Sequence, residues 1–147
     1  MSTRPPITCH ILDTTCGKPA SNVVCSIYKV DVKDEQDVIT VDEPEPFALA
    51  RTNEDGRVPQ WIFNPDPKKR DKLALLGIEE NETGLRWSIL MPGVYKIRFQ
   101  TGKYFSKQGH SSFFPFVEIV FSVEDGSQHY HIPLLLSNYG YTTYRGS

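Results

Sequence analysis

Hydrophobic and polar residues alternate along several short runs of this chain, and turn-forming residues separate the runs. Successive side chains of a β-strand point to opposite faces, so a period of two indicates strands. The clearest run is 94–101, where Val94 and Lys96 fall on one face and Tyr95 and Ile97 on the other. Runs rich in aromatic and β-branched residues predict further strands at 7–12, 23–30, 47–52, 117–123 and 130–136, and a short helix is expected within 103–109.

Two segments interrupt this pattern. Residues 31–46 are rich in Asp and Glu and contain two prolines, which predicts a coiled surface loop. Residues 64–84 carry a Pro-Asp-Pro sequence and a run of basic residues, and we expect a second irregular loop there. Both segments have the character of insertions. By contrast, Asp55-Gly56 is a strong signal for a tight turn, and Arg57 leaves that turn.

Seven or eight short strands with one short helix are typical of an all-β sandwich. A chain of 147 residues fits one domain, and the sequence has no internal repeat. We therefore predict a single β-sandwich domain over residues 1–147, in which 31–46 and 64–84 are loop insertions.

Charge and hydropathy exclude several classes of partner. Sixteen Lys and Arg against eighteen Asp and Glu leave a formal charge of -2, which does not suggest a nucleic-acid surface. A helix needs roughly twenty apolar residues to span a membrane, and the chain has no such stretch. We expect a soluble, intracellular protein with neither nucleic acid nor membrane as partner.

The three cysteines, Cys9, Cys16 and Cys25, fit neither a zinc module nor a disulfide framework. Reduced thiols are the simpler interpretation. Cys9 neighbours His10 and is therefore a candidate thiol nucleophile, but a free cysteine more often behaves as a small buried hydrophobic residue.

Three histidines lie on expected strands, and they are the candidates for chemistry. His129 and His131 share a face, roughly 7 Å apart along the strand. They could bind zinc with His10 as third ligand, or divide between catalysis and the surface. A neutral imidazole can take a proton from water near pH 7, and a neighbouring cation such as Arg57 would favour that neutral form. The chain has no nucleophile elbow, which favours direct attack by water.

The two ends of the chain carry recognisable motifs. The tail 137–147 ends in Tyr144-Arg145-Gly146-Ser147 and resembles the C-terminus of the transthyretin-like 5-hydroxyisourate hydrolases. The resemblance extends through His129-Tyr130-His131, the segment 8–20 around His10, and the turn 52–57, and covers about two-thirds of the chain. The sequence departs from the family in its longer segments 31–46 and 64–84 and in Asn138, where proline is usual.

The resemblance implies a transthyretin-like (prealbumin-like) β-sandwich that hydrolyses 5-hydroxyisourate to 2-oxo-4-hydroxy-4-carboxy-5-ureidoimidazoline in urate breakdown. It places the family's catalytic groups on His10, Arg57 and His131. Ser147 would position water, and Tyr144, Arg145 and Gly146 would complete the substrate pocket. It further implies a homotetramer with its sites between dimers. We expect no cofactor and no metal.

Two other functions stay open. A transthyretin-like binding protein would use the equivalent channel for a small molecule without catalysis, and a zinc-dependent amidohydrolase would contain stoichiometric metal. The tail does not end in Ser-Lys-Leu. We therefore expect the cytoplasm as compartment, with the peroxisome second.

Overall fold

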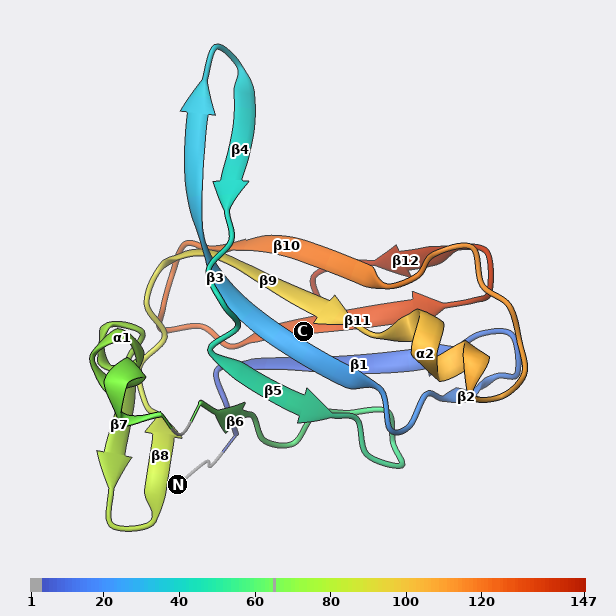
Figure 1. The fold of residues 1–147 in the computed structure, drawn as a ribbon, viewed down its shortest axis with the longest axis horizontal. Coiled ribbons are helices and arrows are strands. Elements are labelled where there is room, and N and C mark those ends of the chain that lie inside the picture. Colours follow the sequence, from blue (N-terminus) through green and yellow to red (C-terminus); the bar gives the residue numbers. More distant parts are fainter. Residues whose placement is uncertain (1–3, 65) are drawn as a thin grey trace.

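Two β-sheets packed face to face form the body of the protein in a computed structural model that describes residues 4–64 and 66–147 (Figure 1). One sheet has the strand order β12-β11-β1-β2, and the other has the order β10-β9-β3-β5-β6. The strands are β1 (Ile7–Asp13), β2 (Lys18–Pro19), β3 (Val24–Glu35), β4 (Val38–Asp42), β5 (Ala48–Arg51), β6 (Ile62–Phe63), β7 (Ile78–Asn81), β8 (Gly84–Trp87), β9 (Gly93–Phe99), β10 (Val117–Val123), β11 (Tyr130–Leu136) and β12 (Tyr141–Thr143). The helices are the 3₁₀-helix η1 (Pro67–Lys69) and the α-helices α1 (Arg70–Leu75) and α2 (Thr101–Ser106).

The core lies between the two sheets and follows from the alternation in the sequence. Every second residue of β1 is buried, and Tyr95, Ile97 and Phe99 of β9 are fully buried. Helix α2 follows β9 and buries Phe105. The predicted sandwich is confirmed, and β10 and β11 have the predicted bounds.

The pairing that matters most for the site is between β1 and β11. These two strands run parallel, with Thr8 opposite His131 and His10 opposite Pro133. Parallel neighbours need a long connection, and here every strand of the other sheet lies between them in sequence. The two ends of the chain are therefore adjacent in one sheet.

The prediction of a coiled loop at 31–46 is wrong for most of its length. Strand β3 continues past Val30 and pairs with β4 as an exposed hairpin that projects from the body (Figure 1). Gln36 and Asp37 form its turn with φ values of 52° and 65°. Acidic residues in this segment point into solvent from strands, and a polar composition alone does not distinguish exposed strands from a loop.

The prediction of an irregular loop at 64–84 is also wrong, except for residue 65, which lies outside the described residues. This segment contains η1, α1 and most of the β7–β8 hairpin. It also contributes to the core, because Leu73 and Ile78 are buried. Just beyond the segment, at the end of β8, Trp87 is buried too, and its ring meets that of Phe47 edge to face at 5.4 Å. The described residues thus hold two α-helices and twelve strands, more than the single helix and seven or eight strands expected.

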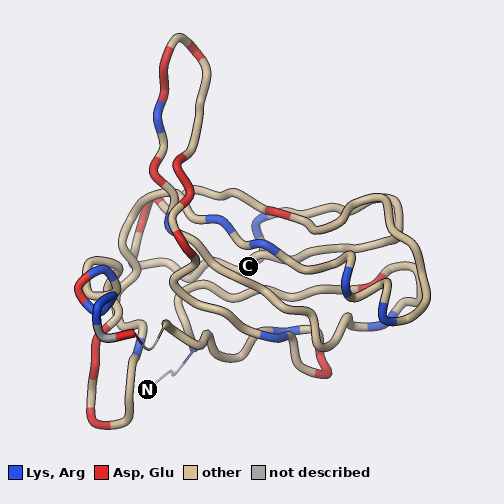
Figure 2. Tube along the Cα trace, viewed as in Figure 1, with Lys and Arg blue, Asp and Glu red and all other residues tan. Residues whose placement is uncertain are grey.

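The protruding hairpin is fixed to the body by a cluster of charges at its base. Lys96 is 5% exposed and forms ion pairs with Glu43, which follows β4, and with Glu118 of β10. Arg98 contacts the same two carboxylates, at 3.0 Å and 2.7 Å. Figure 2 shows the opposite charges gathered where β3, β9 and β10 meet.

Candidate active site

His10 and His131 come together because their strands are paired. The parallel register of β1 and β11 places Thr8, His10 and His131 on one face of the sheet. The rings of His10 and His131 are stacked, with centroids 6.1 Å apart and planes inclined by 22°. Both side chains are half-buried.

Arg57 reaches the histidines from the Asp-Gly turn that the sequence predicts. The Asn53 side chain accepts hydrogen bonds from the backbone N–H groups of Asp55 and Arg57, at 2.9 Å and 3.0 Å. Gly56 has φ of +72°, and a Cβ on it would lie 2.4 Å from the carbonyl oxygen of Ile11, so glycine is required there. The N–H of Ile11 donates to the Gly56 carbonyl at 2.8 Å. The turn is therefore fastened directly to β1, beside His10.

The C-terminal tail closes the opposite side of the site. Gly146 bridges to His131, with its N–H donating to the His131 carbonyl at 2.9 Å. A Cβ on Gly146 would lie 2.7 Å from the His131 ring, so the tail approaches β11 closely only because this residue is glycine. Tyr144 and Ser147 then line the same pocket as the histidines.

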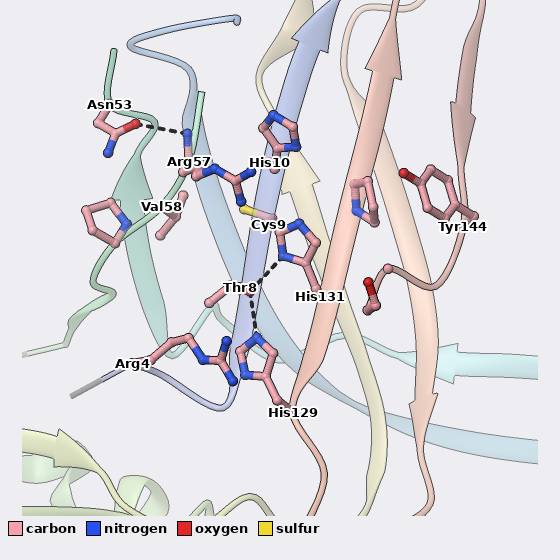
Figure 3. A pocket seen from close by; sticks show the side chains of 14 residues that line it. Arg4, Thr8, Cys9, His10, Asn53, Arg57, Val58, His129, His131 and Tyr144 are labelled. Carbon is pink, nitrogen blue, oxygen red and sulfur yellow. Dashed lines mark hydrogen bonds between the residues drawn. The ribbon is translucent and has the colours of Figure 1, made fainter. Parts of the chain in front are cut away.

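The pocket formed by these elements has a volume of about 560 Å³ and is open to solvent (Figure 3). It brings together six of the seven residues that the sequence assigned to the site: His10, Arg57, His131, Tyr144, Gly146 and Ser147. Sequence reasoning missed several others that line it, among them Arg4, Thr8 and Asn53. Thr8 could have been found because it lies two positions before His10 on a strand, whereas nothing in the sequence marks Arg4.

Arg145 is not brought to this pocket. Its guanidinium lies over the ring of Tyr130, 4.5 Å from the ring centroid, and donates a 2.6 Å hydrogen bond to the side-chain oxygen of Gln128. Residues alternate along the extended tail, so Arg145 points away from the face on which Tyr144 and Gly146 meet the histidines.

The surroundings of both stacked histidines favour their neutral form. Burial lowers the pKa of His10, and the positive charge of Arg57 lowers it further. Burial also lowers the pKa of His131, again with Arg57 next in effect, followed by His10, His129 and Arg4. Two neutral imidazoles beside a fixed cation can accept a proton from water and stabilise a negative oxygen.

A third histidine is linked to this pair through Thr8. The Thr8 hydroxyl lies 2.7 Å from Nδ1 of His131 and 2.9 Å from Nε2 of His129. Cys9, by contrast, is 1% exposed and packs in the core, as expected for a small hydrophobic residue. The three cysteines are free thiols.

The described part of the chain has no cluster of three or more His, Cys, Asp or Glu side chains placed to hold a metal ion. His129 and His131, which the sequence offered as a zinc pair, instead share the Thr8 hydroxyl between them. No helix among the described residues is long and apolar enough to cross a membrane.

Taken together, the two sheets, the short helix α2 and the polar pocket on the β1–β11 pair define a transthyretin-like sandwich with a histidine–arginine site. The sequence profile of the HIUase/Transthyretin family matches residues 7–146. The chain belongs to this family.

Similar proteins include 5-hydroxyisourate hydrolases and a transthyretin in complex with thyroxine. A probable 5-hydroxyisourate hydrolase of Schizosaccharomyces pombe is 38% identical over 97% of this chain and 92% of its own length. The structure of Klebsiella pneumoniae 5-hydroxyisourate hydrolase matches with a TM-score of 0.63 and 28% identity, covering 96% of this chain and 98% of the other. Sea bream transthyretin in complex with thyroxine matches with the same TM-score, 0.63, and 25% identity, covering 96% and 94%. The fold alone therefore does not separate the hydrolases from transthyretin.

Proposed function

We propose that this protein hydrolyses 5-hydroxyisourate, opening its six-membered ring to give 2-oxo-4-hydroxy-4-carboxy-5-ureidoimidazoline. The observation that carries the proposal is the convergence of His10, Arg57 and His131, from three separate segments, on one polar pocket. The hydrolase name of the Schizosaccharomyces relative, which aligns over nearly the whole chain, supports it.

In the proposed reaction a neutral histidine takes a proton from water while the water oxygen bonds to a ring carbonyl carbon. Arg57 donates hydrogen bonds to the carbonyl oxygen as its negative charge develops. The ring C–N bond then breaks, and the leaving nitrogen takes the proton back from the imidazolium. Water is the nucleophile and no electrons are exchanged, so the reaction needs no cofactor.

We assign substrate contacts to His10, Arg57, Tyr144 and Gly146, which line the pocket from opposite sides. Ser147 is proposed to position the attacking water through its hydroxyl or its terminal carboxylate. Arg145 is left out of this set because its guanidinium packs on Tyr130.

The experiment generates 5-hydroxyisourate in situ from urate and urate oxidase and follows the decay of its ultraviolet absorbance. The protein should accelerate the decay, and Arg57→Ala should lower the rate by about 10²–10³, as for loss of an oxyanion-stabilising donor. Arg86→Ala, an exposed arginine on β8 outside the pocket, is the matched control and should leave the rate unchanged. A parallel sample treated with chelator should keep full activity.

A second candidate is a small-molecule carrier, favoured by the match to transthyretin in complex with thyroxine. The charged and hydrogen-bonding groups that fill the pocket argue against it, because an apolar ligand would leave them desolvated without partners. Decay at the spontaneous rate in the presence of the folded protein would reject the hydrolase, and thyroxine binding would then be measured by calorimetry.

A further inference from the structure

Thr8 lies at the centre of a set of hydrogen bonds on one wall of the proposed site. Its hydroxyl contacts Nδ1 of His131 at 2.7 Å and Nε2 of His129 at 2.9 Å (Figure 3). All three side chains are half-buried, so the contacts are shielded in part from water. The geometry follows from register, because Thr8 pairs with His131 and Ile7 pairs with Tyr130, next to His129.

A threonine hydroxyl has one hydrogen to donate and two lone pairs with which to accept. With both histidines neutral, Thr8 can therefore donate to at most one ring and must accept from at least one. If it accepts from His131, the proton of that ring is on Nδ1 and Nε2 carries the lone pair. If it donates to His131, the proton is on Nε2 and that nitrogen cannot act as a base.

The backbone of Pro5 selects between these two arrangements. A hydrogen bond between Pro5 and the His129 ring raises the pKa of His129, while burial and the charge of Arg4 lower it and keep the ring neutral. Proline has no N–H, so its carbonyl is the acceptor and the ring is the donor. Nε2 of His129 already faces Thr8, so the donated proton is on Nδ1 and Nε2 is left as an acceptor.

The position of each proton in this series of hydrogen bonds then follows from the position of the preceding one. Nδ1–H of His129 donates to Pro5, the Thr8 hydroxyl donates to Nε2 of His129, and Nδ1–H of His131 donates to Thr8. The lone pair of His131 is thereby left on Nε2, on the side of the ring that faces Arg57 and His10 in Figure 3.

The ring of His10 is not held by a comparable set of hydrogen bonds among the described residues. Within residues 4–64 and 66–147 its ring stacks on His131 and feels the charge of Arg57, but neither ring nitrogen has a protein hydrogen-bond partner. Nothing in this part of the chain fixes which of its nitrogens carries the proton.

We propose that Thr8 and His129 are positioning residues that hold His131 in the Nδ1–H tautomer, so that His131 rather than His10 is the general base. The assignment of the tautomer stands on the ligand-free geometry. The assignment of the base rests on the proposed hydrolase function.

The test separates these two parts. Nitrogen NMR of protein labelled at histidine, without substrate and above the pKa values of its histidines, reports which ring nitrogen of His131 is protonated. The wild type and Thr8→Ser, which keeps the hydroxyl, should show Nδ1–H. Thr8→Val removes the hydroxyl at nearly constant volume and should shift His131 toward the Nε2–H tautomer.

Turnover is then measured on the same samples. Thr8→Val should lower kcat by about 10–100-fold, the typical effect of removing a residue that orients a functional histidine. KM should change little, since the proposed substrate contacts are made by His10, Arg57, Tyr144 and Gly146 and not by Thr8. Thr8→Ser should stay within a few-fold of the wild type.

His129→Asn provides a second variant should Thr8→Val fail to fold. It removes the acceptor for the Thr8 hydroxyl, which is then free to donate to His131, so His131 should again shift toward the Nε2–H tautomer.

An Nε2–H tautomer in the wild type would overturn the proposal whatever the activity. The expected tautomers with an unchanged kcat in Thr8→Val would overturn the role of His131 as base. The expected tautomers in a protein that does not hydrolyse 5-hydroxyisourate would leave the positioning of His131 supported and remove the proposed function.

Discussion

At the scale of the residue, the site depends on keeping two imidazoles neutral next to an arginine. Burial and Arg57 both lower the pKa of His10 and His131 below the ordinary value of 6.5. The lowered pKa also has a cost for folding. The unfolded chain binds more protons than the folded protein as pH falls from 6.5 toward the lowered values, so the free energy of unfolding decreases over that range.

The proposed hydrolase should therefore lose kcat/KM on the acid side, as pH falls through these lowered pKa values and the base becomes protonated. In Arg57→Gln the pKa of both histidines should rise toward 6.5, because the charge is removed while burial remains. Arg57→Lys keeps the charge and should leave both values low. NMR titration of the ring protons measures this directly, and unchanged pKa values in Arg57→Gln would contradict the role of the charge.

The residues that sequence could identify are those whose role depends on a local motif. Arg57 follows an Asp-Gly turn, and His131 alternates with His129 on a strand, so spacing predicts where they lie in the fold. Their assignment to the site rests on the family resemblance. Thr8 could have been placed on the same face as His10 by strand alternation, but its hydrogen bond to His131 could not be predicted, because the two residues are 123 positions apart. The motif also could not predict the direction of the Arg145 side chain, because that direction is set by packing on Tyr130.

At the scale of the element, the projecting hairpin of β3 and β4 is joined to the body only through its base, as far as the described residues show. Beyond Val30, the β3 residues pair with β4 and with no other strand. The side chains of this part of the hairpin are exposed on both faces. The hairpin therefore contributes little to the core, and its base is held by Lys96 and Glu43.

Shortening this hairpin should leave the rest of the protein intact. Replacing residues 33–40 by Asn-Gly joins the paired residues Val32 and Val41 through a favoured two-residue turn. Urea unfolding should show a change of less than about 1 kcal/mol, in the range of surface substitutions, and turnover should be retained. Leu73→Ala in α1 is the contrasting variant, and it should cost about 2–5 kcal/mol because Leu73 is buried. A shortened protein that fails to fold would show that the hairpin is structural.

The elements differ in how far sequence could predict them. Strands β10 and β11 each have a face that packs against the core, so their pattern of hydrophobic residues predicts which positions are buried. Strands β3 and β4 have no buried face beyond Val30, and their turn is Gln36-Asp37 instead of the usual Asn-Gly. Helix α1 has one buried residue in six, too few for a helical period to be visible.

At the scale of the whole molecule, the strands at the edges of the two sheets offer surfaces through which subunits could associate. Strands β10 and β12 are edge strands of the two sheets, and Val120, Tyr141 and Tyr144 on or beside them are 54%, 40% and 57% exposed. Unpaired strand edges with apolar side chains favour association with further strands. The pocket is open to solvent in the single chain.

We propose a homotetramer in which neighbouring subunits complete the open pocket. Sedimentation velocity should give a tetramer, and specific activity should fall on dilution below the concentration at which it dissociates. A monomer with full specific activity would reject this assembly.

The parallel pairing of β1 with β11 also dictates when the site can exist during synthesis. Thr8 cannot form its hydrogen bond to His131 until that residue, 123 positions further along the chain, has been synthesised. Until that residue has left the ribosome, β1 has a vacant edge, the Asp-Gly turn rests on an incomplete sheet, and no pair of histidines is present. Nascent chains arrested before β11 should be inactive and should depend on chaperones to shield the unfilled strand position, and completed chains should gain their fold and their chemistry in the same late step.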